Sequence, residues 1–275
     1  MQLHSKTALI TGGASGIGFG MAQAFASEGA RVAIADLDGA AAERAAVQLA
    51  ATGARTIAVR LDVADRAAWE GAVDAAERAL GPIDVLCNNA GVLGAFQPVA
   101  DIALENWDWL ININVMGAIH GVQCVVPRMR RHGGGYIVNT ASIAGLDPIP
   151  LLADYSLSKS AVIALSECLR TELATFGIGV SVLCPGPVVT ALVATSAQRR
   201  PRQPVAAESS QKSDQAHADE VVSEMGDAPL EPLAVGALVV RAVRAGNFYV
   251  FTHPSYRARI ERRMGEMIAS FDQRA

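Results

Sequence analysis

Short apolar segments alternate along the chain with longer segments whose apolar residues recur at helical spacing. The short segments predict seven strands, at Lys6–Thr11, Arg31–Asp36, Arg55–Leu61, Ile83–Cys87, Tyr136–Thr140, Gly179–Cys184 and Phe248–Thr252. The longer segments predict helices at Gly16–Glu28, Gly39–Ala51, Arg66–Leu80, Asn106–His132, Ala153–Phe176, Leu233–Ala245 and Ser255–Phe271. Strands and helices in this alternation are joined by crossover connections, which produce a parallel sheet.

The predicted strands are nearly continuous in apolar residues, as in Val180–Cys184, which suits a sheet that helices cover on both faces. We therefore expect an α/β fold of the doubly wound Rossmann type, with a mostly parallel sheet and ligands at the carboxyl ends of the strands. The 275 residues are 51% hydrophobic and show no division into two core-forming patterns. A single domain over 1–275 is expected.

Two segments after the sixth predicted strand depart from this alternation. The segment 191–232 carries Arg199, Arg200 and Arg202 and then a stretch rich in Ser, Gln, Asp and Glu. Because it follows a strand end, we expect a mobile flap over the active site, with a short helix near Ala216–Met225; a solvated loop without a role is the alternative. The segment 255–271 has apolar residues on one side, which predicts a helix that packs against its own domain or a partner subunit.

Composition and charge weigh against several classes of protein. The formal net charge is −4, so an attraction of the whole chain to nucleic acid is not expected. Met1–Thr11 lacks the features of a signal peptide, and no uninterrupted apolar run approaches the roughly 20 residues that span a bilayer. We expect a cytoplasmic protein with no membrane role. The cysteines and histidines are scattered, which favours buried free thiols and no metal site.

A glycine-rich turn follows the first predicted strand, at Thr11–Gly18. Gly12, Gly16 and Gly18 permit a tight turn and a close approach of the backbone to a ligand. The next helix begins at the same point, so its free N–H groups can face a pyrophosphate. Glycine is common in any strand-to-helix turn, but its place after the first strand favours a dinucleotide site.

Asp36 ends the second predicted strand and indicates which dinucleotide is used. A carboxylate at this position can accept hydrogen bonds from an adenosine ribose and would repel the additional phosphate of NADP. The neighbouring Ser15 and Leu37 supply no positive charge for that phosphate. We therefore predict NAD as the cofactor, although Asp36 taken alone could be a helix cap. Asp62-Val63 ends the third strand, where an adenine ring could lie.

Tyr155 and Lys159 are four residues apart at the start of a predicted helix, so their side chains share a face. A lysine ammonium favours a phenolate and would lower the pKa of Tyr155 from its usual value near 10. Tyr155 could then exchange a proton with an alcohol or ketone oxygen. Ser142, just after the fifth strand, could hydrogen-bond the same oxygen. Asn114 could hold a water linked to Lys159; an ordinary buried amide, or Asn112 in its place, stays open.

Together these residues resemble the classical short-chain dehydrogenase/reductase family over roughly Lys6 to Thr190. The resemblance includes the turn at Thr11–Gly18, the segment Asn88–Gly91, the set Asn114/Ser142/Tyr155/Lys159 and the segment Pro185–Thr190. It implies that Tyr155 is the acid/base, that Lys159 binds the nicotinamide ribose and tunes Tyr155, that Ser142 orients the substrate and that Asn114 supports a proton relay. It implies cofactor contacts by Gly12, Ser15, Gly16, Ile17, Gly18, Asp36, Leu37, Asp62, Val63, Asn89, Ala90, Gly91, Tyr155, Lys159, Pro185, Gly186, Val188 and Thr190.

The resemblance also implies a sheet of strand order 3-2-1-4-5-6-7 and a homodimer or homotetramer. The usual subunit contact would use the helices at Asn106–His132 and Ala153–Phe176. The chain departs from many members of the family at its end, where Phe248–Pro254 and a further helix replace a glycine-rich segment. This departure puts the usual tetramer contact of the last strand in doubt. The ending and the region after Ser142 are similar to a subgroup that contains aryl-ether Cα-dehydrogenases.

The expected reaction is the reversible, NAD-dependent oxidation of a secondary alcohol to a ketone. The predicted pocket residues are mostly apolar and favour a bulky hydrophobic or aromatic substrate: Ile143, Ala144, Leu146, Ile149, Leu151, Leu152, Val189 and Leu192. One alternative is a 3-oxoacyl reductase, against which Asp36 weighs because such reductases usually use NADPH. Another is a catalytically idle NAD-binding sensor or scaffold, which would not need the Tyr155/Lys159 pair.

Overall fold

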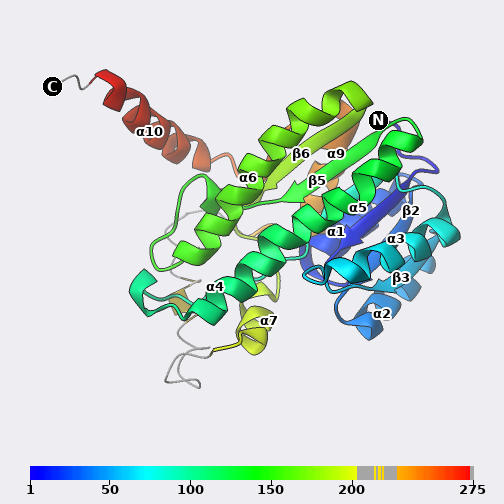
Figure 1. Cartoon of the computed structure of the whole chain (residues 1–275), viewed down its shortest axis with the longest axis horizontal. Helices are drawn as coiled ribbons and strands as arrows, with labels where there is room; N and C mark the ends of the chain where they lie inside the picture. The colour runs from blue at the N-terminus through cyan, green and yellow to red at the C-terminus, as the bar shows by residue number, and fades with distance from the viewer. Residues whose placement is uncertain (203–213, 215, 218, 220–227, 273–275) are drawn as a thin grey trace.

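A computed structural model describes residues 1–202, 214, 216–217, 219 and 228–272 of the chain. Its centre is a seven-stranded sheet of order β3-β2-β1-β4-β5-β6-β7, in which all neighbouring strands run parallel (Figure 1). The strands are β1 (Thr7–Thr11), β2 (Arg31–Asp36), β3 (Thr56–Arg60), β4 (Val85–Asn88), β5 (Gly135–Thr140), β6 (Ile178–Cys184) and β7 (Tyr249–Phe251). The predicted doubly wound fold and its strand order are confirmed.

Helices follow the strands as predicted, with ends that their local sequence explains. They are α1 (Gly16–Ser27), α2 (Gly39–Ala50), α3 (Arg66–Leu80), α4 (Leu104–Ile111), α5 (Gly117–Arg131), α6 (Ala153–Leu173), α7 (Leu192–Arg199), α9 (Pro232–Ala245) and α10 (Tyr256–Ala269). Asp38 and Asp65 cap α2 and α3, because each side chain accepts a hydrogen bond from a backbone N–H of the first turn. Gly246, at φ +75°, ends α9 in the left-handed conformation.

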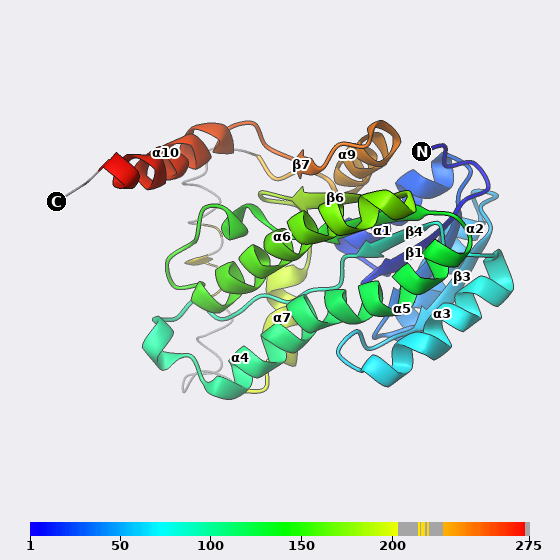
Figure 2. The same cartoon turned by 45° about the horizontal axis from the view of Figure 1, so that its top comes forward.

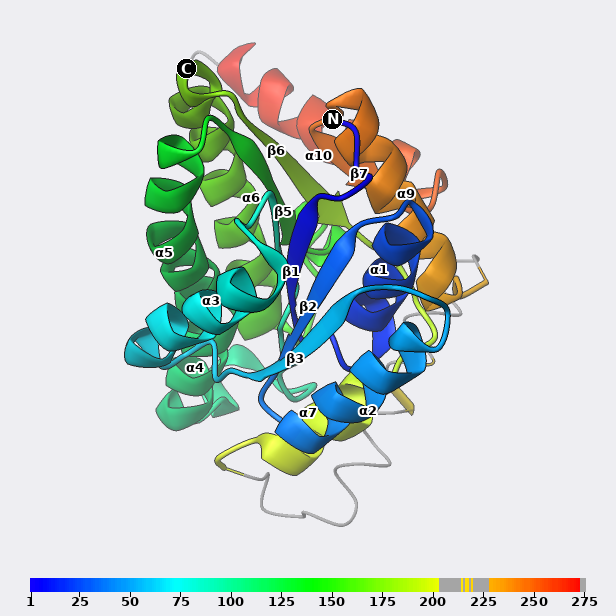
Figure 3. The ribbon, with the colours of Figure 1, turned by 90° about the vertical axis from the view of Figure 1, so that its right-hand side faces the viewer.

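Helices cover the sheet on both faces (Figure 3). α1, α2 and α9 lie on one face, and α3, α5 and α6 lie on the other. Each face has its own hydrophobic core: Met21 and Phe25 of α1 pack into the first, and Trp69, Met129 and Ile137 pack into the second. Because both faces are buried, the strands need apolar residues at successive positions, which explains their continuous apolar character.

A π-helical turn at Asn112–Met116 joins α4 and α5 into one continuous helix, Leu104–Arg131. By length and composition alone this helix could cross a membrane, since its most apolar window has a mean hydropathy of 1.4. However, 44% of that window is buried inside the protein, and α5 packs against α3, β4 and β5. The apolar composition is therefore that of a helix which covers the sheet.

The structure describes the segment 191–232 in part and the segment 255–271 in full. Within 191–232, α7 is formed and the chain returns at Leu230, which pairs with Val188. The short helix expected near Ala216–Met225 lies mostly outside the described residues. The C-terminal helix is formed as α10, but it extends away from the sheet (Figure 2).

The apolar side of α10 does not pack against the rest of the described chain along its outer part. Tyr256 is buried, and Arg259 pairs with Asp147, so the first turns are attached. Further along, the exposed fractions of Met267, Ile268 and Phe271 are 52%, 66% and 82%. Of the two predicted alternatives, packing against its own domain does not hold for the outer turns, and packing against a partner subunit stays a prediction.

α1 and α9 cross with their backbones in direct contact, at Gly20 and Gly236. A Cβ added at Gly20 would lie 2.1 Å from the carbonyl oxygen of Pro232, and one added at Gly236 would lie 2.2 Å from that of Gly20. No side chain fits between the two helices at this crossing. The contact attaches the end of the chain to its first helix and completes the core on that face of the sheet.

Gly20→Ala and Gly236→Ala should each lower the free energy of unfolding by about 1–3 kcal/mol, because the helices must separate to admit a methyl group. Gly71→Ala is the matched control, since an added Cβ in this part of α3 meets nothing within 4 Å. The control should raise stability by up to about 1 kcal/mol. Denaturant unfolding followed by circular dichroism measures all three. Equal effects at the three sites would contradict the close crossing.

Candidate active site

The glycine-rich turn lies between the end of β1 and the start of α1, beside the point where the strand order reverses between β1 and β4. Gly12 and Gly16 have φ of +60° and +50°, which other residues rarely adopt. A Cβ at Gly18 would lie 2.1 Å from the carbonyl oxygen of Gly12. Ser15 precedes the helix but its side chain makes no capping hydrogen bond, and Ile17 packs against the core. The turn therefore has the backbone shape that a dinucleotide pyrophosphate requires.

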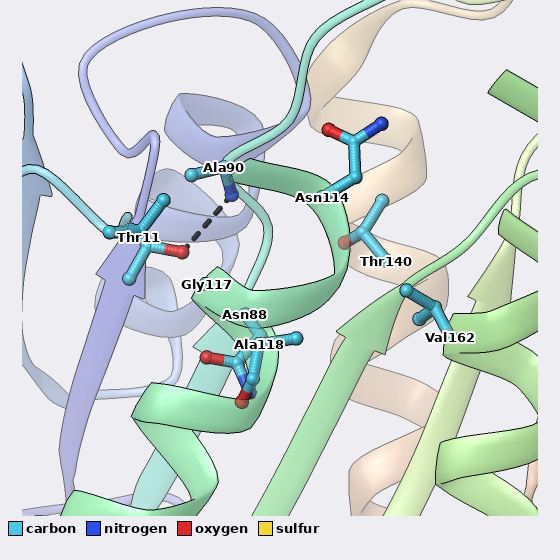
Figure 4. Close-up of a pocket in the computed structure, with 9 residues that line it drawn as sticks. Thr11, Asn88, Ala90, Asn114, Gly117, Ala118, Thr140 and Val162 are labelled. Atoms are coloured by element: carbon cyan, nitrogen blue, oxygen red, sulfur yellow. Dashed lines mark hydrogen bonds between the residues drawn. The ribbon is translucent and has the colours of Figure 1, made fainter. Parts of the chain in front are cut away.

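Asn89 connects this turn to the neighbouring strands. Its amide nitrogen donates hydrogen bonds to the carbonyl oxygens of Thr11, at 3.0 Å, and Gly12, at 3.4 Å, and its amide oxygen accepts one from Thr140. The Thr11 hydroxyl in turn accepts from the backbone N–H group of Asn89 and from that of Ala90, the second of which Figure 4 shows. The ends of β1, β4 and β5 are thus held at fixed separations, and Ala90 and Gly91 leave space beside them.

The predicted adenosine side of the site lies at the ends of β2 and β3. The Asp36 carboxylate accepts hydrogen bonds from the backbone N–H groups of Ala14, at 3.2 Å, and Asp38, at 3.1 Å, which places it against the glycine-rich turn. Leu37 beside it is 40% exposed. Asp62 bonds the N–H of Ala64, and the Val63 carbonyl accepts from the Trp69 indole at 3.1 Å.

The segment Pro185–Thr190 returns to the glycine-rich turn from the end of β6. A Cβ at Gly16 would lie 3.1 Å from the Thr190 methyl group, so the two segments are in contact. The backbone N–H of Gly186 donates to Thr252, at 2.9 Å, and Val188 pairs with Leu230. The end of the chain therefore holds in place the segment that is expected to bind the nicotinamide end of the cofactor.

Tyr155, Lys159 and Ser142 come together where α6 begins. Tyr155 forms a hydrogen bond with Ser142, and the Lys159 ammonium lies 5.6 Å from the centre of the Tyr155 ring. The Lys159 ammonium donates to the carbonyl oxygen of Thr140 at 3.0 Å, which attaches α6 to the end of β5. Exposed fractions of 4%, 7% and 9% for Lys159, Ser142 and Tyr155 show that water has little access to the three side chains.

Burial has the largest effect on the pKa values of Tyr155 and Lys159. It raises the pKa of the Tyr155 phenol, and the hydrogen bond with Ser142 offsets only part of this rise. Burial also lowers the pKa of Lys159 to about 8. Burial thus moves the pKa of Tyr155 in the direction opposite to the one expected from the nearby lysine. The lowering of this pKa by Lys159 stays a prediction.

Asn114 lies in the π-helical turn and faces the same region. Its amide oxygen accepts from the backbone N–H of Val92 at 2.8 Å, and its amide nitrogen donates to the Val92 carbonyl and to Ser158. A Cβ at Gly91 would lie 3.2 Å from the Asn114 amide oxygen and 3.3 Å from the Lys159 ammonium. The structure thus distinguishes Asn114 from Asn112, which the sequence alone could not do.

A small polar cavity lies beside Asn114 (Figure 4). Its volume is about 10 Å³, and it is lined by Thr11, Val63, Asn88, Ala90, Asn114, Gly117, Ala118, Thr140 and Val162. The buried amide oxygen of Asn88 has no hydrogen-bond partner among the described residues. The room and the polar lining suit a single water molecule.

The residues predicted to line the substrate pocket do not all belong to one hydrophobic cluster. Ala144, Leu152 and Tyr155 share one apolar cluster, with Ile149 and Leu192 packed against it. Leu146 packs instead against a cluster behind the site, while Ile143 is buried outside both clusters. Val189 and Leu151 are 51% and 38% exposed.

The apolar cluster also includes residues that the sequence analysis missed. Val92 and Leu93 are buried in it, and Phe96, Trp109 and Val193 pack against it. Val92, Leu93 and Phe96 belong to the loop that follows β4. Loops at the carboxyl ends of parallel strands surround the ligand site in this architecture, so the position of this loop could have indicated them.

The structure thus combines a glycine-rich strand-to-helix turn with a buried tyrosine–lysine pair at the same edge of the sheet. A family model described as short chain dehydrogenase matches residues 6–201. The chain is 35% identical over 262 residues, 94% of this chain and 87% of the relative, to 1-deoxy-11-beta-hydroxypentalenate dehydrogenase of Streptomyces exfoliatus. It is 31% identical over 270 residues, 98% of this chain and 87% of the relative, to C alpha-dehydrogenase of Sphingobium sp. SYK-6.

A crystal structure of a short-chain dehydrogenase/reductase from Burkholderia phymatum in complex with NAD superposes with a TM-score of 0.90 at 34% identity. The superposition covers 98% of this chain and 96% of the other. The chain therefore belongs to the short-chain dehydrogenase family. It is an oxidoreductase of the type that uses a nicotinamide cofactor.

Lys159→Met should change how stability depends on pH. The pKa of Lys159 is about 8 in the folded chain and higher in the unfolded chain, so the unfolded chain binds more protons between these values. Relative to a chain without this lysine, Lys159 should therefore contribute a rise in stability of roughly 1–3 kcal/mol from about pH 8 to about pH 10. Lys159→Met should lack this rise. Urea unfolding at a series of pH values measures it, and equal slopes for the two proteins would contradict a buried ammonium.

Proposed function

We propose that this protein is an NAD(H)-dependent oxidoreductase that interconverts a secondary alcohol and a ketone, with Tyr155 as the general acid/base. The observation that carries the proposal is the buried group of Tyr155, Ser142 and Lys159 at the carboxyl edge of the sheet. The glycine-rich turn, Asp36 and Thr190 border the same edge and have the shape and chemistry to hold a dinucleotide.

A nicotinamide cofactor held by the glycine-rich turn, Asp36 and Thr190 would supply the hydride-transfer chemistry between the alcohol carbon and the ketone. Ser142 donates a hydrogen bond to the substrate oxygen and fixes its position. The Tyr155 phenolate oxygen takes the proton of the alcohol as the ketone forms, and the resulting phenol gives it back in the reverse direction. Lys159 binds the ribose next to the nicotinamide, and its charge favours the phenolate of Tyr155.

Asn114 and the cavity beside it extend this arrangement toward solvent. We propose that a water in the cavity, bound near Asn88 and Asn114, connects Lys159 with solvent. The Lys159 ammonium already bonds Thr140, whose side chain contributes to the cavity lining. Such a relay would carry away the proton that alcohol oxidation releases.

The apolar cluster around Tyr155 supports a bulky hydrophobic or aromatic substrate. It combines Leu152 and Leu192 with Phe96 and Trp109, and it offers few polar groups other than the catalytic ones. The relatives named above are, by their names, a dehydrogenase of 1-deoxy-11-beta-hydroxypentalenate and a C alpha-dehydrogenase. A screen of aromatic secondary alcohols with NAD, read by NADH absorbance, tests the substrate class. A chain that binds NADH but is inert to every alcohol and ketone would favour the sensor alternative.

Tyr155→Phe should lower kcat by roughly 100- to 10,000-fold, because it removes the only proposed acid/base atom and leaves the ring in place. Binding of NADH, followed by fluorescence titration, should change little. Tyr249→Phe is the control, since Tyr249 lies on β7 and bonds Glu167 at the surface. Retained turnover in Tyr155→Phe would rule out Tyr155 as the base.

NAD should be preferred over NADP, and Asp36→Asn should reduce that preference at least about tenfold by removing the charge that repels the additional phosphate. The backbone N–H groups of Ala14 and Asp38 each bond a different carboxylate oxygen of Asp36, so asparagine keeps the acceptor for one of these two hydrogen bonds and loses the other. The ratio of kcat/KM for the two cofactors measures the effect, with Asp38→Asn as a neighbouring control. An advantage for NADP in the natural chain would refute the NAD assignment.

The predicted homodimer or homotetramer stays a prediction, as does the cytoplasmic location. The apolar residues exposed on α10 would suit self-association, because monomeric soluble proteins rarely leave several neighbouring apolar side chains exposed to water. The family resemblance places the usual subunit contact on α4, α5 and α6 instead.

A further inference from the structure

The first turns of α10 are attached to the rest of the domain by specific contacts. Tyr256, at the start of the helix, is buried. Arg259 forms an ion pair with Asp147, and Arg263 donates a hydrogen bond to the carbonyl oxygen of Leu146. Leu146 and Asp147 belong to the loop between β5 and α6 that follows the proposed catalytic serine. These contacts set the direction in which α10 leaves the domain.

One side of α10 carries a regular row of apolar residues. The row consists of four residues at successive spacings of four, three and four positions: Ile260, Met264, Met267 and Phe271. This is the spacing of the apolar seam along which two helices pack as a coiled coil. The exposed fraction rises along the row, from 39% at Met264 to 82% at Phe271. The row therefore begins against its own domain, and its outer part projects beyond the described part of the chain that could cover it.

The charged residues of α10 and its final turn are divided by sign between the two halves of the segment. The first half, 256–264, contains four arginines and one glutamate. The second half, 265–272, contains Glu266 and Asp272 and neither lysine nor arginine. Two copies packed antiparallel would place the positive half of each beside the negative half of the other, whereas parallel packing would bring like charges together. The helix is thus complementary in charge to a second copy of itself in the antiparallel direction.

The same charges weigh against a lipid surface as the occupant of the row. A helix that lies on an anionic membrane presents lysine and arginine along its apolar side. The most exposed part of the row on α10 is flanked instead by the carboxylates of Glu266 and Asp272. The contacts of Arg259 and Arg263 also keep the outer turns directed away from the chain's own sheet (Figure 2). A second copy of the chain is therefore the occupant that the row and its charges fit best.

We propose that the apolar row of α10 is an interface between two copies of this chain, whose C-terminal helices pack antiparallel about a two-fold axis. Each copy supplies the same residues to such an interface. The contact differs from the usual family contact through α4, α5 and α6, and it does not depend on the function proposed for the active site. Few side chains of each copy take part, so the buried area should be smaller than the roughly 1,600 Å² of a standard interface. Pairing should therefore depend on protein concentration.

Met267→Glu in the full chain tests the interface, because it would bury a carboxylate in the middle of the row. At concentrations where the natural chain is paired, this variant should halve the molar mass measured by sedimentation equilibrium, with association weakened at least about tenfold. Ala269→Glu is the matched control, since it adds the same charge on the same turn at an exposed position on the opposite side of the helix. Circular dichroism checks that both variants are folded.

Equal molar masses for the natural chain and both variants would overturn the proposal. Binding of the natural chain, but not of Met267→Glu, to vesicles of phosphatidylcholine and phosphatidylserine would also overturn it, since the row would then belong to a membrane surface.

Spin labels measure the direction of the paired helices. Cys168 is exposed and the other three cysteines are buried, so Cys168→Ser gives the background for labelling. A single label is attached through Ala258→Cys, near the start of α10, or through Ala269→Cys, near its end. From the helical rise of about 1.5 Å per residue, antiparallel packing should make the distance between the two copies roughly 10–30 Å longer at 258 than at 269. Equal distances at the two positions, or long distances at both, would contradict the antiparallel pair.

Discussion

The hydrogen bond from the Lys159 ammonium to the carbonyl oxygen of Thr140 fixes where α6 begins relative to the end of β5. Ser142 follows β5 directly and Tyr155 is one helical turn before Lys159, so this bond also sets the separation of the two side chains that would hold the substrate oxygen. The arrangement depends on keeping a cation out of water. The Thr140 carbonyl oxygen at the end of β5 replaces part of the lost hydration by accepting a hydrogen bond from the ammonium. The ends of the strands in a parallel sheet offer such acceptors.

Tyr155 and Lys159 both lie on α6, and both side chains are buried. In the absence of a ligand, burial moves the pKa values of Tyr155 and Lys159 toward their neutral forms.

Much of this architecture can be predicted from the sequence, because the alternation of strand and helix periods determines a parallel sheet and brings strand-end residues to one edge. Gly12, Asp36, Ser142 and Tyr155 were found in this way. The π-helical turn that selects Asn114 over Asn112 could not be predicted, since it depends on how α4 and α5 pack. The direction of the Tyr155 pKa also required the degree of burial, which no motif contains.

The pairing of Val188 with Leu230, supported by the hydrogen bond from the Val189 N–H to the Leu230 carbonyl at 3.0 Å, closes the excursion between them at its base. A loop that is closed at its base can change in length at low cost, about 0.6 kcal/mol for each doubling. The sheet and the cofactor edge do not need to adjust when it changes. Substrate range in this architecture can therefore diversify by replacement of one insert, while the hydride-transfer machinery is inherited unchanged.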